Sequence, residues 1–116
     1  MGHHDAEVDA RLREIIEAWS LINDLPEYAR KLHGYGDSNG GFGITYPSDL
    51  DEYQREVEGI SIPEGMVQAY GYWGPPEGYE FLVAETEYLR VLAEVLFEKG
   101  LVDEAVSVKE LAELRA

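Results

Sequence analysis

Carboxylates are the most numerous side chains in this sequence that could do chemistry. The 116 residues include 24 acidic and nine basic side chains, three histidines and no cysteine, with a formal net charge of −15. Acid–base and nucleophilic catalysis most often use histidine or cysteine. His3 and His4 lie in residues 1–5, which we interpret as disordered or tag-derived, and His33 is expected to stabilise a helix end. We therefore predict that the protein is not an enzyme.

The glycine-rich segment 34–43, GYGDSNGGFG, departs from the known phosphate and calcium loops. It lacks the third glycine of a dinucleotide fingerprint, and no Lys-Ser or Lys-Thr pair follows it as in a P-loop. Its run from Asp37 to Gly40 begins like a calcium loop, but Gly41 and Ser48 stand where ligands are required. Carboxylate pairs are too common in this composition for any one pair to indicate a glycosidase. We expect no cofactor and no bound metal.

The carboxylates are concentrated in the middle of the chain. Between Leu32 and Leu89 there are eleven acidic residues and one basic residue, Arg55, which gives −10 for this part alone. Such a surface repels nucleic acid and anionic membranes, because both are polyanions, and it attracts a basic protein. The alternative is that the acidity serves only solubility or reflects a salt-adapted host, since net charge by itself speaks to solubility and association.

Two stretches of this acidic middle part are expected to form a contact surface. On a predicted helix at 49–57, Asp49, Glu52 and Glu56 form a stripe, and the like charges of Glu52 and Glu56 one turn apart disfavour the isolated helix. Aromatic residues in the following hairpin lie near further carboxylates, and such combinations are typical of binding hot spots. The predicted partner-binding residues are Asp37, Asp49, Asp51, Glu52, Glu56, Glu58, Glu64, Tyr70, Tyr72, Glu77 and Glu80.

The elements that must position these residues follow from turn signals and alternation. Runs at 66–73 and 79–84 flank the turn sequence GPPEG and predict a hairpin, with Tyr70 and Tyr72 on one face and Trp73 on the other. Alternation at 42–46 predicts a strand, whereas residues 34–43 are expected to be irregular because of their five glycines. Ile60 and Ile62 are expected to begin another strand.

The helical segments follow from apolar residues at spacings of three and four. A first helix is predicted from Ala6 until Pro26 ends or kinks it near Leu25, and residues 27–32 add one or two further turns. Ser48 and Asp51 resemble a capping box for the helix at 49–57, with Leu50, Tyr53 and Val57 on its apolar face. Helices are also predicted at 85–99, ended by Gly100, and at 103–114.

These elements predict one domain over residues 1–116, with enough apolar residues for a core. The expected fold class is α+β, in which a small, mainly antiparallel sheet of three or four strands packs against N- and C-terminal helices. No segment has the roughly 18 apolar residues of a membrane span, and residues 1–5 do not have the pattern of a signal peptide. A cytoplasmic protein is expected.

The segment from Ile62 to Leu96, IPEGMVQAYGYWGPPEGYEFLVAETEYLRVLAEVL, resembles small acidic immunity proteins of bacterial polymorphic toxin systems, including those of contact-dependent growth inhibition. The resemblance implies a cytoplasmic protein that binds a cognate toxin and blocks its active site or a neighbouring surface. Many such toxins attack nucleic acids and have basic clefts, so the carboxylates would take the place of phosphates. The expected function is thus non-catalytic neutralisation of a basic protein toxin, in a heterodimer.

Two further hypotheses come from other functional classes. The first is a small ligand-binding protein or hydrolase with its pocket between residues 34–43 and the hairpin, which would require converging carboxylates with one raised pKa. The second is a regulatory module that forms a homodimer through its C-terminal helices.

Overall fold

The structure, a computed structural model, describes residues 6–37, 41–59, 61–72 and 78–116. The expectations for residues 1–5, Ile60, Trp73 and Glu77 lie outside these ranges. The elements are α1 (Ala6–Glu17), η1 (Ile22–Asp24), α2 (Leu25–Arg30), β1 (Tyr35–Asp37), β2 (Phe42–Thr45), η2 (Pro47–Asp49), α3 (Glu52–Glu56), β3 (Met66–Gly71), β4 (Tyr79–Ala84), α4 (Glu85–Glu98) and α5 (Val102–Leu114).

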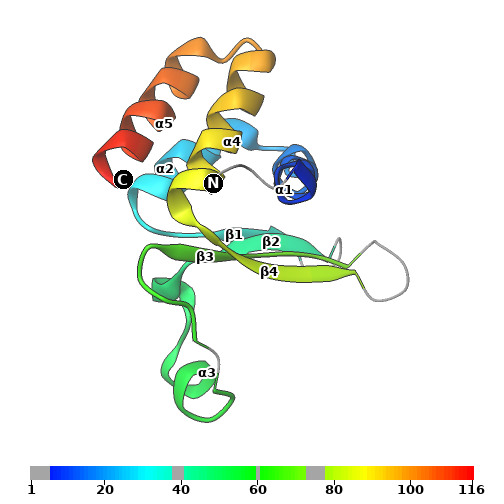
Figure 1. Ribbon diagram of the computed structural model, residues 1–116, viewed down its shortest axis with the longest axis vertical. Coiled ribbons are helices and arrows are strands. Elements are labelled where there is room, and N and C mark those ends of the chain that lie inside the picture. The colour runs from blue at the N-terminus through cyan, green and yellow to red at the C-terminus, as the bar shows by residue number, and fades with distance from the viewer. Residues whose placement is uncertain (1–5, 38–40, 60, 73–77) are drawn as a thin grey trace.

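The α+β class predicted from the sequence is confirmed. The four strands form one antiparallel sheet in the order β1-β2-β3-β4. Figure 1 shows α1, α2, α4 and α5 on one side of this sheet and α3 on the other side. The core lies between the sheet and the helices, where Leu12, Ile16 and Leu92 pack with Ile44 and Val67 at 1 % exposure or less.

The hairpin of β3 and β4 confirms the predicted alternation. Its register pairs Met66 with Ala84 and Gly71 with Tyr79. On β3, Val67 and Ala69 are buried against the helices, whereas Gln68 and Tyr70 on the opposite face are partly exposed. The sheet therefore has an inner face that contributes to the core and an outer face that helices α1, α2, α4 and α5 leave uncovered.

Two expectations for the first half of the chain were wrong. Pro26 begins a helix instead of ending one: α1 stops at Glu17, and Pro26 lies in the first turn of α2, where its missing N–H leaves no hydrogen bond unmade. Part of the glycine-rich segment is also regular, because β1 pairs with β2 through Tyr35 and Ile44. The Tyr35 ring, 5.1 Å from the Trp19 ring, anchors this strand in the core.

The predicted helix at 49–57 is shorter than expected. Asp49 belongs to η2, and α3 covers only Glu52–Glu56. The expected capping box on Ser48 was wrong, since the Ser48 hydroxyl donates to the Leu32 carbonyl. The cap residue is Asp51, whose carboxylate accepts from the Gln54 N–H at 2.8 Å while the Gln54 side chain accepts from the Asp51 N–H. Ile62 is buried but belongs to no strand.

The C-terminal helices agree with prediction, and α4 and α5 form an antiparallel pair (Figure 1). Gly100 ends α4 with a φ of +82°, a conformation that favours glycine. Its N–H donates to the Phe97 carbonyl, and the Leu101 N–H donates to the Leu96 carbonyl, which is the Schellman pattern.

Candidate functional site

The outer face of the sheet carries two tyrosines whose rings are in contact. The rings of Tyr70 and Tyr72 are 5.5 Å apart, and the Tyr72 hydroxyl donates to the Glu80 carboxylate at 2.9 Å. This hydrogen bond raises the pKa of Tyr72, and partial burial raises it further. Burial, aided by the charge of Asp37, raises the pKa of Tyr70. Four of the predicted site residues, Asp37, Tyr70, Tyr72 and Glu80, are thus brought together on this part of the sheet.

Two glycines give the Tyr70 side chain its place. A Cβ atom built on Gly36 would lie 2.4 Å from the Tyr70 hydroxyl, and one built on Gly43 would lie 2.6 Å from it. Gly43 is also confined by backbone, because its Cβ would lie 2.4 Å from the Tyr35 carbonyl oxygen. The Tyr70 side chain therefore packs directly on both glycines. A Cβ atom at Gly36 would clash severely only with the movable Tyr70 side chain, whereas one at Gly43 would clash with backbone as well.

We expect Gly43→Ala to destabilise the fold by about 2 kcal/mol, because it clashes with backbone in a packed sheet. Gly36→Ala should cost about 1 kcal/mol in the native protein, but little or nothing in a Tyr70→Phe background, where the clashing hydroxyl is gone. Urea unfolding of the three single variants and of the double variant Gly36→Ala, Tyr70→Phe measures this. Equal costs of Gly36→Ala in both backgrounds would contradict the arrangement.

Helix α3 presents apolar side chains to solvent. The sequence pattern placed Leu50, Tyr53 and Val57 on one apolar face, but only Leu50 is buried, while Tyr53 is 61 % and Val57 is 66 % exposed. Glu52, Glu56 and Glu58 are exposed beside them. Large exposed apolar side chains within an acidic rim are typical of a surface that is covered by a partner.

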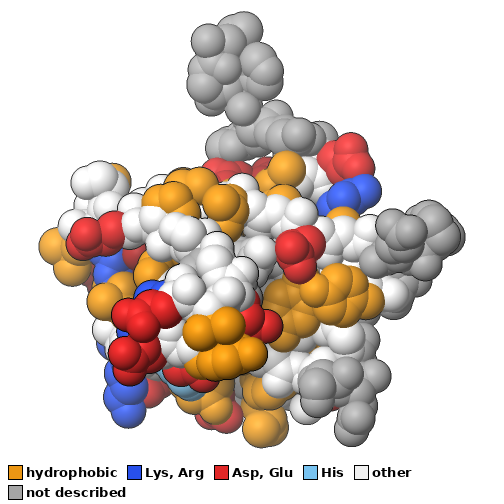
Figure 2. Space-filling model, turned by 90° about the horizontal axis from the view of Figure 1, so that it is seen from below, with side chains coloured by type: hydrophobic (Ala, Val, Ile, Leu, Met, Phe, Trp, Pro, Cys, Tyr) orange, Lys and Arg blue, Asp and Glu red, His pale blue; other side chains and the backbone are white. Residues whose placement is uncertain are grey.

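We define the acidic face as the exposed side chains of α3 and its flanks together with those of the outer sheet surface. Figure 2, which views the molecule from the side of α3, shows acidic and hydrophobic side chains next to each other there. Its exposed or partly exposed members are Asp37, Asp51, Glu52, Tyr53, Arg55, Glu56, Val57, Glu58, Tyr70, Tyr72, Glu80 and Leu82.

The acidic face differs from the helical side in how its charges are compensated. On the helical side, Arg90 pairs with Asp9, Glu87 and Glu94, and Arg13 pairs with Glu94 and Glu98. The acidic residues of α3, its flanks and β4 form no ion pair with any described residue. They are Asp51, Glu52, Glu56, Glu58 and Glu80. These five carboxylates therefore carry unpaired negative charge, and they outnumber Arg55, the exposed basic residue of α3.

Two predicted site residues lie apart from this face. Asp49 is 18 % exposed, and its carboxylate accepts hydrogen bonds from the N–H groups of Gly34 and Tyr46 at 2.8 and 2.7 Å and contacts His33 Nδ1 at 2.8 Å. It joins η2 to the start of β1 and has an internal structural role. Glu64 is exposed at the edge of a separate cavity.

A shallow depression of about 390 Å³ lies between the start of β1 and α3, in the region predicted for a ligand pocket. It is lined by Gly36, Thr45, Gln54 and Tyr70, and its one carboxylate, Asp49, is already bonded internally. Within the described ranges, no three His, Asp or Glu side chains are grouped so that they could hold a metal ion. The depression lacks the converging carboxylates that the hydrolase hypothesis requires.

Glu85, one of the eleven acidic residues in the middle part of the chain, is a buried carboxylate at the start of α4. It is 5 % exposed, and its Oε2 accepts hydrogen bonds from the Tyr46 hydroxyl, at 2.6 Å, and from the Arg115 guanidinium. Arg115 also donates to the Ala29 carbonyl at 2.8 Å. Burial raises the pKa of Tyr46 far above its usual value, and the bond to Glu85 adds to this. The network joins β2, α2, α4 and α5.

The outward surface of α4 and α5 is the region required by the homodimer hypothesis. Phe97 is 62 % and Val106 is 49 % exposed, and they line a groove of about 220 Å³ with Ala93 and Lys109. Charged residues of both signs, Glu94 and Lys109, line this groove.

The chain was compared with protein-family models, curated proteins and solved structures. No family model, curated protein or solved structure matches this chain. Among the described residues, no helix is both long and apolar enough to cross a membrane.

Proposed function

We propose that this protein is a non-catalytic inhibitor that binds a basic protein through its acidic face. The resemblance of residues 62–96 to immunity proteins supports a toxin as the partner, namely a nuclease-type effector with a basic cleft. The acidic face would neutralise this toxin in the cytoplasm by covering its active site or an adjacent surface.

The observation that carries the proposal is the density of unpaired carboxylates on the acidic face, where they outnumber Arg55. Arg13 and Arg90 pair with several carboxylates of the helical side, whereas Glu52, Glu56 and Glu58 are in no ion pair with a described residue. Like charges held together raise the free energy of the unbound surface, and a cationic partner relieves this repulsion. The same field steers a basic protein toward the face before contact.

Contact itself would rest on the exposed apolar side chains. Tyr53 and Val57 lie on α3, and Tyr72 and Leu82 lie on the outer sheet surface at 53 % and 45 % exposure. Their burial supplies the non-directional part of affinity, at about 25 cal/mol for each Å² removed from water. The carboxylates around them would set orientation and association rate, since rim charges contribute more to rate than to affinity.

The experiment uses the protein encoded by the neighbouring gene as the candidate toxin. We expect a one-to-one complex whose association rate falls steeply between about 50 and 500 mM salt, because the Debye length shortens over this range. We also expect the complex to suppress the toxic activity of that protein. Absence of a complex, or an association rate that does not change with salt, would overturn the proposal.

A further inference from the structure

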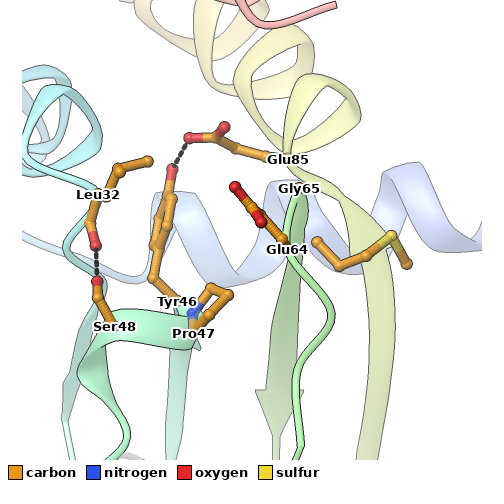
Figure 3. Close-up of a pocket in the computed structure, with 8 residues that line it drawn as sticks. Leu32, Tyr46, Pro47, Ser48, Glu64, Gly65 and Glu85 are labelled. Atoms are coloured by element: carbon orange, nitrogen blue, oxygen red, sulfur yellow. Dashed lines mark hydrogen bonds between the residues drawn. The ribbon is translucent and has the colours of Figure 1, made fainter.

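A small cavity lies between the end of α2, η2, the start of β3 and the start of α4 (Figure 3). Its volume is about 120 Å³, which is room for a few non-hydrogen atoms, given that one water molecule occupies about 30 Å³ in the liquid. The side chains of Leu32, Pro47 and Met66 form apolar walls. The cavity is therefore suited to a narrow hydrocarbon chain.

Two carboxylates line the same cavity, one from the turn before β3 and one from the start of α4. Figure 3 shows Glu85 beyond the Tyr46 hydroxyl and the exposed side chain of Glu64 directed toward them. Both hydrogen bonds to Glu85 from described residues go to Oε2, from Tyr46 and Arg115, which leaves Oε1 able to accept another. One arginine stands against two glutamates, so the lining carries a net negative charge.

Leu32 reaches this cavity through a backbone conformation that leucine rarely adopts. Its φ is +57°, and it is the one non-glycine residue with positive φ among the described residues. It occupies the position after the α2 cap where glycine is usual, and this backbone conformation is strained for a residue with a Cβ atom. Its side chain is 46 % exposed, so burial in the core does not account for it. The Leu32 side chain instead forms a wall of the cavity.

We propose that this cavity binds the side chain of a lysine of the basic partner. The unbranched stem would lie against Leu32, Pro47 and Met66, and the ammonium group would interact with Glu64, Glu85 and the Tyr46 hydroxyl. An anion would meet two carboxylates, and a purely apolar group would desolvate Glu64 without providing a cation for it. The source of the lysine rests on the proposed function, whereas the chemistry of the cavity does not.

The test is an NMR titration of the full chain with N-acetyl-lysine methylamide. Its neutral counterpart, N-acetyl-norleucine methylamide, has the same stem without the ammonium group. We expect the lysine amide to shift the Met66 methyl and Glu64 amide signals with a Kd on the order of 1 mM, and the norleucine amide to bind at least about fivefold more weakly. Equal binding of the two probes, or none, would overturn the proposal.

Two variants locate the binding site. Leu32→Gly removes a wall while relieving the backbone, so it should weaken lysine-amide binding about threefold or more without lowering the unfolding midpoint. Glu64→Gln should weaken binding about two- to fivefold, whereas Glu58→Gln, its matched control on the acidic face, should leave it unchanged. Equal effects of the two glutamine variants would overturn the assignment to this cavity.

The source of the lysine is tested separately. If n-butylammonium binds and the lysine amide does not, the site takes a free amine and the inference is wrong. If the neighbouring gene product binds the native protein and Leu32→Gly equally well, the inference fails while the proposed function stands. If that gene product does not bind at all but the lysine amide does, the proposed function fails, and with it the source of the lysine.

Discussion

Replacing Arg115 with alanine is expected to destabilise the fold by about 3 kcal/mol, because it leaves the buried charge of Glu85 without a cation. Glu85 is 5 % exposed, and the same arginine holds the Ala29 carbonyl at the end of α2. The value lies at the lower end of the range for breaking a buried ion pair, since the Arg115 side chain is 22 % exposed and part of its interaction is screened by solvent.

Urea unfolding followed by circular dichroism measures this loss. Arg55→Ala is the matched control, because Arg55 lies exposed on α3 and its removal should change stability by no more than about 0.5 kcal/mol. The double variant Glu85→Gln, Arg115→Ala should recover part of the lost stability, since no buried charge is then left alone. If Arg115→Ala unfolds at the same urea concentration as Arg55→Ala, the network does not stabilise the fold.

Reversing two charges on α3 should slow association with the proposed basic partner by about tenfold or more at low salt, because the steering field acts most strongly from the charges that face the partner. The variant is Glu52→Lys, Glu56→Lys. Both side chains are exposed, and neither is in an ion pair with a described residue, so the fold should be retained. The rate difference from the native protein should nearly vanish at about 500 mM salt.

The control changes the same charge elsewhere on the molecule. Glu110→Lys, Glu113→Lys alters the net charge by the same amount but lies on α5, on the other side of the sheet. It should slow association only about two- to threefold, because long-range attraction depends on where the charge faces the partner. If both pairs slow association equally, the effect comes from total charge, and the acidic face has no special role.

The parts of the fold that could be predicted are those with strong local signals. The hairpin follows from alternation on both sides of a Gly- and Pro-rich turn, and α4 follows from its apolar spacing and from Gly100 at its end. These signals come from residues that are close in the sequence, so the predicted elements depend little on contacts with distant parts of the chain. The α+β class followed from the order of such elements.

The parts that could not be predicted depend on distant residues. β1 exists because Tyr35 packs on Trp19 and pairs with Ile44, and neither contact is visible in a segment of five glycines. Pro26 is compatible both with the end of one helix and with the start of the next. Its position in the first turn of α2 is set by the core around Leu25.

The sequence predicted that the candidate surface is acidic and aromatic, but not which side chains are exposed on it. Periodicity placed Tyr53 and Val57 on an apolar face, but it could not tell that this face meets solvent. Glu85 is a residue of the same type as Glu80, yet one is buried and the other is exposed, because only Glu85 meets an arginine from the far end of the chain. The role of each proposed contact residue stays a prediction.

Helix α3 extends from the domain on the side of the sheet away from the helices, and it packs only sparsely on other elements. Its side chains can therefore be exchanged with little effect on folding, in contrast to those of α1 or α4. If α3 makes the proposed contact, its residues could change repeatedly during evolution while the core stays constant, so that binding specificity would change with little loss of stability. Related proteins with different targets would then differ most in residues 51–58 and least in the sheet.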